Sequence, residues 1–514
     1  MHAALQNLEV IHTVSSHAEH GTLPALASTC HAFQSPALDV LWRNLQSVEP
    51  LVKCLPTDLF DTDRVWNLQK PFDNKMWDTL FKYTSRVHSI TVKQTSHPSA
   101  FIGSLSLIML SYPSARASLF PNLCKLTWHA GGSPFAAEFL RMTFVPSLLV
   151  LNLRFSSASF IFLSVLSSLG TLCPHLQSMS LKCRPTTEDL SSPFIAQPIS
   201  QLHNLRTLKL WDLGNRGIDH IMQLQALRTL HLDLRISSAG ERKSCLSFPG
   251  FHNLHYLRLS FGAFKRAMDF LSSLEVIRSE EIELVFASQI VESSESISTP
   301  LFQFLAILPK ICDNEKLKRL SLVGSRNIPT QLAVFMPLCA FRNLIGLEVE
   351  KSCSTSISDE ELCQLVRAWP RLQALKISCY IAIGTTAVPT FHGLLGLLRL
   401  CPSLTSLALV IDTTKLEGIN LRSPGGENFS TRLKDLTLGN SIISSPLNVA
   451  LILSGLFPYL EQVNLDCWDT APMNSSRSVL HKYSEMEKWE AVNSFLHGFS
   501  IVRKRIVPSF QDDG

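Results

Sequence analysis

A nine-residue pattern recurs along most of this 514-residue chain. Its form is apolar-x-x-Leu-x-x-Leu-x-Leu, as in "FPNLCKLTW" (120–128), "LHNLRTLKL" (202–210) and "WPRLQALKI" (369–377). Further copies occupy 145–153, 173–181, 224–232, 251–259, 314–322, 341–349, 401–409, 430–438 and 457–465, with weaker copies at 279–286 and 85–92. From Leu123 to Leu460, twelve intervals span 337 residues, or about 28 residues each. So regular a series predicts a stack of similar units.

Each copy ends in L-x-L, which predicts a strand with its leucines turned inward. Helical segments lie between the strands. In "SDEELCQLVRAW" (358–369), Ser358 and Glu361 have capping-box spacing, and "SPLNVALILSGLF" (445–457) places Pro446 at the first helical position. A strand and a helix every 28 residues are typical of leucine-rich repeats. We therefore predict an α/β fold, a horseshoe-shaped leucine-rich-repeat solenoid with a parallel concave sheet and convex helices. The alternative is a coincidental set of Leu-rich helices.

Polar segments and the C-terminal region complete the predicted organisation. The Ser-rich segments 233–250 and 291–300 are expected to be loops between repeats. The solenoid is predicted to cover 61–470, and 471–514 a linker (471–478) and an amphipathic capping helix. The apolar residues of that helix recur at helical spacing and are Leu480, Tyr483, Met486, Trp489, Val492, Phe495 and Leu496. This helix would cover the apolar end of the last repeat.

Composition limits the compartment and the partners. Apolar residues make up 46% of the chain and charged residues 17%, with a formal charge of +4, so neither nucleic acid nor a membrane is expected as an obligatory partner. The 13 cysteines form no C-x-x-C motif, and many lie beside apolar repeat positions. Unpaired, buried thiols indicate a reducing compartment. We expect the cytoplasm or, given "RKR" at 503–505, the nucleus.

The N-terminal region carries a second recognisable pattern. "LPALASTCHAFQSPALDVLWRNL" (23–45) contains two apolar helical faces separated by a Ser-Pro break, and "SVEPLVKCLPTDLF" (47–60) follows. Together these segments closely resemble the second half of the F-box, and its extension, in the large fungal F-box/leucine-rich-repeat family. We therefore expect residues 1–60 to form a small helical F-box-like domain and its extension.

That resemblance implies a function. In the family, the F-box docks on the Skp adaptor, and through it on a cullin, in an SCF-type ubiquitin ligase, while the repeats hold a protein substrate. Carried over by position, the adaptor-binding residues would be Leu8, Val10, Ile11, Val14, Leu23, Leu26, Ala27, Phe33, Pro36, Leu41 and Trp42. The first helix departs from the family pattern, with Ser15 in place of a Phe and His17 in place of a Leu. The alternatives are a helical cap without a partner and a leucine-rich-repeat scaffold with a degenerate F-box and no ubiquitination role.

The chain carries no motif for catalysis. It has no phosphate-binding loop, no H-E-x-x-H and no G-x-S-x-G, and its acidic residues are scattered over the repeats. The pair His17 and His20 has helical spacing but lacks further ligands for a metal. We predict no catalytic residue, metal or cofactor, and therefore a non-enzymatic binding protein.

The outward strand positions form the predicted substrate surface. In the first repeats they are basic, whereas later repeats lean acidic, with Glu348 and Asp435. The predicted substrate-binding residues are Lys125, Arg154, Lys182, Lys209, Trp211 and Arg258, the first four in one row with Trp211 exposed at its edge. Such a row would attract an acidic or phosphorylated protein segment. The alternative is an ordinary solvated strand face.

Overall fold

A computed structural model of the chain provides the coordinates. The residues that it describes are 7–56, 59–61, 67–68, 70, 72–93, 118–131, 134–155, 159–183, 192–237, 247–286, 298–324, 328–350, 353–377, 387–426, 432–438, 441–465 and 476–506. The chain divides into two compact units, Met1–Arg242 and Lys243–Gly514, a division that falls inside the predicted repeat region.

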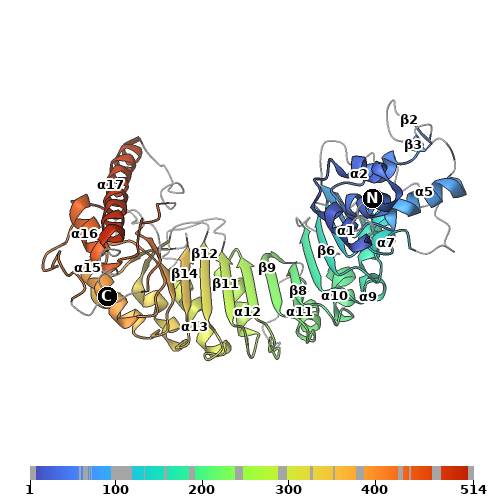
Figure 1. Cartoon of the computed structure of the whole chain (residues 1–514). Coiled ribbons are helices and arrows are strands. Elements are labelled where there is room, and N and C mark those ends of the chain that lie inside the picture. The colour runs from blue at the N-terminus through green and yellow to red at the C-terminus, as the bar shows by residue number, and fades with distance from the viewer. Residues whose placement is uncertain are drawn as a thin grey trace. The chain divides into compact units, whose positions relative to one another are not determined.

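The first unit combines N-terminal helices with the first repeats (Figure 1). Its helices are α1 (Leu8–His17), α2 (Leu23–Thr29), α3 (His31–Arg43), α4 (Glu49–Lys53), α5 (Asn74–Thr84), α7 (Pro134–Thr143), α8 (Phe160–Leu166), α9 (Leu169–Leu172), α10 (Ser192–Ser200) and α11 (Gly214–Met222). Its strands are β1 (Asn44–Leu45), β4 (Ser89–Lys93), β5 (Lys125–His129), β6 (Val150–Phe155), β7 (Ser178–Cys183), β8 (Thr207–Asp212) and β9 (Thr229–Ser237), with a separate antiparallel pair, β2 (Phe60–Asp61) and β3 (Asn67–Leu68).

The second unit continues the repeats. Its helices are α12 (Phe264–Ser272), α13 (Ser298–Ile311), the 3-10 helix η4 (Leu332–Ala340), α14 (Asp359–Val366), α15 (Phe391–Leu400), α16 (Pro446–Leu456) and α17 (Ser476–Ile506). Its strands are β10 (Tyr256–Phe261), β11 (Glu281–Phe286), β12 (Arg319–Gly324), β14 (Gly346–Glu350), β16 (Ala374–Ile377), β17 (Ser406–Leu409) and β18 (Asp435–Thr437). A separate parallel pair is formed by β13 (Ile328–Gln331) and β15 (Cys353–Ser356).

The repeat strands pair in parallel and in chain order within each unit. The order is β1-β4-β5-β6-β7-β8-β9 in the first unit and β10-β11-β12-β14-β16-β17-β18 in the second. The register aligns the first leucine of each L-x-L, so that Leu126 lies beside Leu151, and Leu347 beside Leu375. All four side chains are fully buried, and such burial contributes about 2 kcal/mol per leucine. This parallel order with helices between strands confirms the predicted leucine-rich-repeat solenoid fold.

Local sequence signals place several helices. Ser358 accepts a hydrogen bond from the backbone N–H of Glu361, and the Glu361 carboxylate accepts one from the Ser358 N–H, which forms the predicted capping box at the start of α14. Pro446 is the first residue of α16, where a proline costs no helical hydrogen bond. The two helices therefore begin where the sequence predicts.

The N-terminal helices connect directly to the first repeat. Strand β1 immediately follows α3 and pairs in parallel with β4, Leu45 lying beside Ile90. The predicted Ser-Pro break is wrong, because α3 runs continuously from His31 to Arg43 with Pro36 inside it. Pro36 is buried there. As the sixth residue of α3, Pro36 lacks the N–H that would bond the carbonyl four residues earlier, and the helix continues through the site without that hydrogen bond.

Helix α17 packs against the last repeat. The predicted strand in "FPYLEQVNL" does not form, although the Asn464 N–H donates to the Leu436 carbonyl at 2.9 Å. Instead, the Asn493 side chain of α17 bonds both backbone groups of Val463, at 2.8 Å to its N–H and 3.0 Å to its carbonyl. Trp489 is buried and donates its indole N–H to the Ser441 carbonyl at 2.9 Å. Side chains of α17 thus replace the next strand as hydrogen-bond partners.

Three predicted segment boundaries differ from the structure. The expected loop 233–250 begins with strand, because β9 extends to Ser237. The expected loop 291–300 ends in helix, since α13 begins at Ser298, and the expected linker 471–478 ends at Ser476, where α17 begins. Residues 247–250 are described and include an isolated bridge between Phe248 and Leu274, whereas 238–246, 291–297 and 471–475 lie outside the described residues. Ser-rich composition predicted these loops, but it marks the ends of neighbouring elements poorly.

Of the seven apolar residues predicted on the C-terminal helix, three are buried, namely Trp489, Val492 and Leu496. Met486 is half-buried and Phe495 is exposed, whereas the side chains of Leu480 and Tyr483 lie outside the described set.

Candidate functional site

Four of the eleven predicted adaptor-binding residues form the interior of the N-terminal helices. Ile11, Leu23, Phe33 and Pro36 are buried where α1, α2 and α3 pack on one another. Their direct contact with a partner is therefore excluded unless the helices rearrange. Periodicity alone could not separate these residues from exposed ones, because the inward and outward faces of α1 both carry apolar side chains.

The exposed members of the set lie on α1. Leu8 is 67% exposed, Val10 37% and Val14 43%. Val10 and Val14 are four residues apart and share one face of the helix. His17 extends that face and is exposed, whereas Ser15 lies on the inner face, fully buried, and donates its hydroxyl to the Ile11 carbonyl at 2.8 Å. We call Val10 and Val14 the α1 patch; Leu8, the first residue of the helix, lies at helical spacing from the buried Ile11 and Ser15.

The remaining predicted residues are half-buried. Leu26 and Ala27 lie on α2, and Leu41 and Trp42 near the end of α3. Trp42 stacks on Tyr83 of α5, with ring centroids 4.5 Å apart and an interplanar angle of 29°. This contact uses one face of the indole inside the unit. The adaptor-binding role of these four residues stays a prediction.

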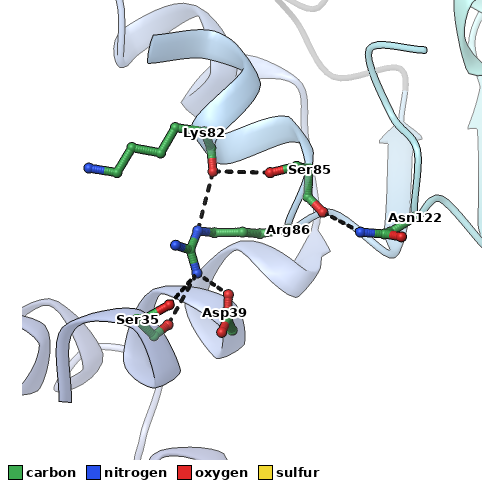
Figure 2. A network of polar contacts seen from close by, with 6 residues as sticks. All are labelled: Ser35, Asp39, Lys82, Ser85, Arg86 and Asn122. Carbon is green, nitrogen blue, oxygen red and sulfur yellow. Dashed lines mark hydrogen bonds and ion pairs between the residues drawn. The ribbon is translucent and has the colours of Figure 1, made fainter. Parts of the chain in front are cut away.

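A polar network fixes α3 to α5 and to the first repeats (Figure 2). Arg86 donates to the Lys82 carbonyl at 3.2 Å, to the Ser35 carbonyl and hydroxyl at 3.2 Å each, and to the Asp39 carboxylate. Asn122, just before β5, donates to the Ser85 carbonyl at 2.7 Å. The network borders a cleft of about 680 Å³ that His12, Arg43 and His88 also line. The hydrogen bonds of this network hold the N-terminal helices in a fixed position on the repeats.

The predicted basic row on the sheet is wrong in its membership. Lys125 lies beside Val150 and Ser178, and Lys209 lies beside Ser180, whereas Arg154 and Lys182 lie beside each other. The reason is that these residues occupy three different positions relative to the two leucines of L-x-L. Lys125 precedes the first leucine, Lys209 lies between the two, and Arg154 and Lys182 follow the second. Successive outward positions are about 7 Å apart along a strand. Aligning the leucines themselves would have given the correct row.

The row that does form consists of Lys93, His129, Arg154 and Lys182, on β4 to β7. Lys93, Arg154 and Lys182 are exposed and His129 is half-buried. Burial lowers the pKa of His129, and the positive charges of Arg154, Lys93 and Lys182 lower it further. We call these four residues the β4–β7 basic row. Lys93 and His129 were missed as site residues at the sequence level.

Trp211 does not lie exposed at the edge of this surface. It is 3% exposed, and its ring meets Phe155 of β6 edge-on, with centroids 6.5 Å apart. Strand alternation would place it outward, but the pairing of β8 with β9 is irregular between Trp211 and Asp212. Such irregularities re-aim side chains at strand ends. A role of Trp211 as an exposed aromatic anchor is therefore excluded.

In the second unit the outward charges are paired across strands. Arg258, predicted to bind substrate, forms an ion pair with Glu283 at 3.0 Å. Arg319 forms an ion pair with Glu281 at 2.7 Å, and Lys376 forms one with Glu348 at 3.0 Å. Asp435 accepts a hydrogen bond from Ser406 at 3.0 Å. Glu348 therefore adds no unbalanced negative charge to the surface expected to lean acidic, because Lys376 on the neighbouring strand balances its charge.

Four of the described thiols are poorly suited to nucleophilic chemistry. Burial raises the pKa of Cys173 and of Cys312 to about 12, and that of Cys54 and of Cys401 to about 11. A thiol with such a pKa is almost fully protonated at neutral pH. Within the described residues, no group of three or more metal-ligating side chains occurs, and no helix is both long and apolar enough to cross a membrane.

Comparison with known proteins gives a structural likeness but no family. No family model matches the chain, and no curated protein matches it. The chain is similar to an internalin (inlF) from Listeria monocytogenes, with 15% sequence identity over 84% of this chain and 99% of that chain, and a TM-score of 0.38. The assignment of the repeat fold rests on the strand order and register described above.

Proposed function

We propose that this chain is a substrate-recognition subunit of an SCF-type ubiquitin ligase. Its N-terminal helices would bind the Skp adaptor, and through it a cullin, while the repeats hold a protein substrate. The observation that supports this proposal best is the α1 patch. Val10 and Val14 stay exposed although Ile11, Leu23 and Phe33 already fill the interior beneath them. A small apolar strip over a complete core is suited to a partner's apolar surface.

The mechanism would require no bond-making by this chain. A receptor raises the effective concentration of its substrate near the ubiquitin-charged enzyme, provided that both stay bound at a suitable spacing. The Arg86 network and the pairing of β1 with β4 would serve that purpose, because they fix the N-terminal helices to the first repeats. Rigid attachment would transmit the position of the adaptor to the substrate.

The proposal is tested by adaptor capture with the full chain. We expect immobilised Skp adaptor to retain the wild-type protein, and the double variant Val10→Asp, Val14→Asp to bind at least tenfold more weakly, because two charges would enter an apolar contact. Both positions are exposed, so the melting temperature should change little. Ser16→Asp is the matched control, since Ser16 is exposed on another side of α1. Failure of the wild-type protein to bind, where an intact F-box protein does, would contradict the proposal.

A second candidate is a leucine-rich-repeat scaffold whose F-box is degenerate. Ser15 favours this function, because it is fully buried where the F-box family carries a Phe, so a large anchor is lost. The Trp42–Tyr83 stack also favours this function, since one face of the Trp42 ring is covered inside the unit and is not free to contact an adaptor. The N-terminal helices would then only cap the first repeat. In that case the repeats would still bind their protein partner, but adaptor capture would fail for the wild-type chain.

A further inference from the structure

The β4–β7 basic row combines charge and order in a way that no other described part of the sheet does. Lys93, His129, Arg154 and Lys182 are cross-strand neighbours in register. Adjacent strands lie about 4.8 Å apart, so the row is roughly 14 Å long. The four strands, "SITVK", "KLTWH", "VLNLRF" and "SMSLKC", contain no acidic residue.

In the second unit, three outward basic residues of the sheet are paired with acidic residues. Each of Arg258, Arg319 and Lys376 has a glutamate on the neighbouring strand within 3.0 Å. Among the described residues, no acidic side chain lies within 4 Å of Lys93, Arg154 or Lys182 in that way. Placing like charges side by side destabilises a sheet. Among the described residues the positive charge of the row is thus not balanced, which suits a negatively charged ligand.

We infer that the β4–β7 basic row binds an extended acidic segment of a protein partner, lying across the four strands. An extended peptide rises about 3.3 Å per residue and turns alternate side chains to one face. Three acidic residues at positions i, i+2 and i+4 span roughly 13 Å, which matches the row. The recognised chemistry is a row of anionic oxygens, from carboxylates or from phosphorylated side chains. This inference rests on the proposed function in one respect, that the repeat sheet is the substrate-binding surface.

The test is fluorescence anisotropy with the full chain and a labelled decapeptide containing Glu-x-Glu-x-Glu. We expect the Gln-x-Gln-x-Gln counterpart to bind at least tenfold more weakly. A phosphoserine version separates the two sources of charge, since tighter binding of it identifies phosphorylated segments and equal binding identifies carboxylates. The affinity should fall steeply as salt is raised from 50 to 300 mM, because screening weakens exposed charge pairs.

Two single variants separate the row from overall charge. Arg154→Glu should weaken binding of the Glu peptide at least tenfold, whereas Lys125→Glu, with the same charge change on an exposed residue outside the row, should weaken it less than threefold. Arg154→Glu should also fold normally, because it relieves repulsion from Lys93 and Lys182. Equal loss in the two variants would overturn the inference, as would equal binding of the Gln peptide or tighter binding of a ten-nucleotide single-stranded DNA.

The outcome for the row and the outcome for the proposed function can be told apart. Arg154→Glu should be retained by the Skp adaptor as well as the wild-type protein, because the α1 patch is intact. Loss of peptide binding with adaptor capture preserved concerns the row alone. Peptide binding without adaptor capture contradicts the ligase proposal and leaves the acidic-segment site standing.

Discussion

Trp42 and Tyr83 show how a residue that resembles a partner anchor can serve the interior. Their stacked rings join α3 to α5 beside the Arg86 network. The expected F-box resemblance around Trp42 rests on residues 23–60 and does not include α5, whose Tyr83 lies about 40 residues further along the chain. The resemblance therefore could not predict which face of Trp42 is used internally. The exposed α1 patch is the sharper place to test adaptor binding.

His129 gives a pH prediction at the residue scale. Its pKa is lowered in the free protein, chiefly by burial and then by three neighbouring cations, Lys93, Arg154 and Lys182. Unfolded histidine has a pKa near 6.5, so the unfolded chain binds this proton more readily, and protonation lowers stability as pH falls below about 6.5. A bound acidic peptide reverses the local charge and raises the pKa of His129. Peptide affinity should therefore rise as pH falls from about 7.5 to 5.5.

The measurement is peptide anisotropy across that pH range. Glutamate, with a pKa near 4.3, stays ionised throughout, so the probe itself contributes little. His129→Asn should flatten the pH dependence while the affinity at pH 7.5 changes less than threefold. A pH dependence that persists in His129→Asn would assign it to other histidines and remove His129 from the site.

At the scale of elements, the repeats were predictable and their outward faces were not. The L-x-L pattern predicted the repeat strands, except in 457–465 where no strand forms, because buried leucines must repeat with the sheet's own period. Which outward side chains form a row across the sheet depends on the register between strands. That register follows the alignment of the leucines and not the spacing of the lysines. The pairing of Arg258 with Glu283 and the burial of Trp211 were not predictable for a related reason. Cross-strand pairing and an irregular strand step cannot be read from one strand alone.

The docking of α17 supplies a prediction at this scale. Asn493→Ala would leave the N–H and the carbonyl of Val463 without their side-chain partner in a half-buried site, so we expect a loss of about 1–3 kcal/mol in the free energy of unfolding. Urea unfolding followed by circular dichroism measures this loss. Ser494→Ala is the control, because Ser494 is exposed, and its effect should stay within about 0.5 kcal/mol. Equal stability of the two variants would show that the Asn493 bonds to Val463 are not needed to complete the last repeat.

At the scale of the whole molecule, one chain would carry two binding surfaces. The α1 patch would hold the adaptor and the β4–β7 basic row would hold an acidic segment, both within the unit Met1–Arg242. Neither surface requires catalysis, and each can be disabled without touching the other. The central claim is that both are occupied at once, which is what distinguishes a receptor from a scaffold.

The most direct measurement is a bridging assay. Skp adaptor is fixed to a surface, the full chain is added, and capture of the labelled Glu-x-Glu-x-Glu peptide is recorded. The account predicts peptide capture with the wild-type chain, loss of both protein and peptide with Val10→Asp, Val14→Asp, and loss of peptide alone with Arg154→Glu. A wild-type chain that binds the peptide in solution but brings none to the adaptor surface would contradict the receptor account.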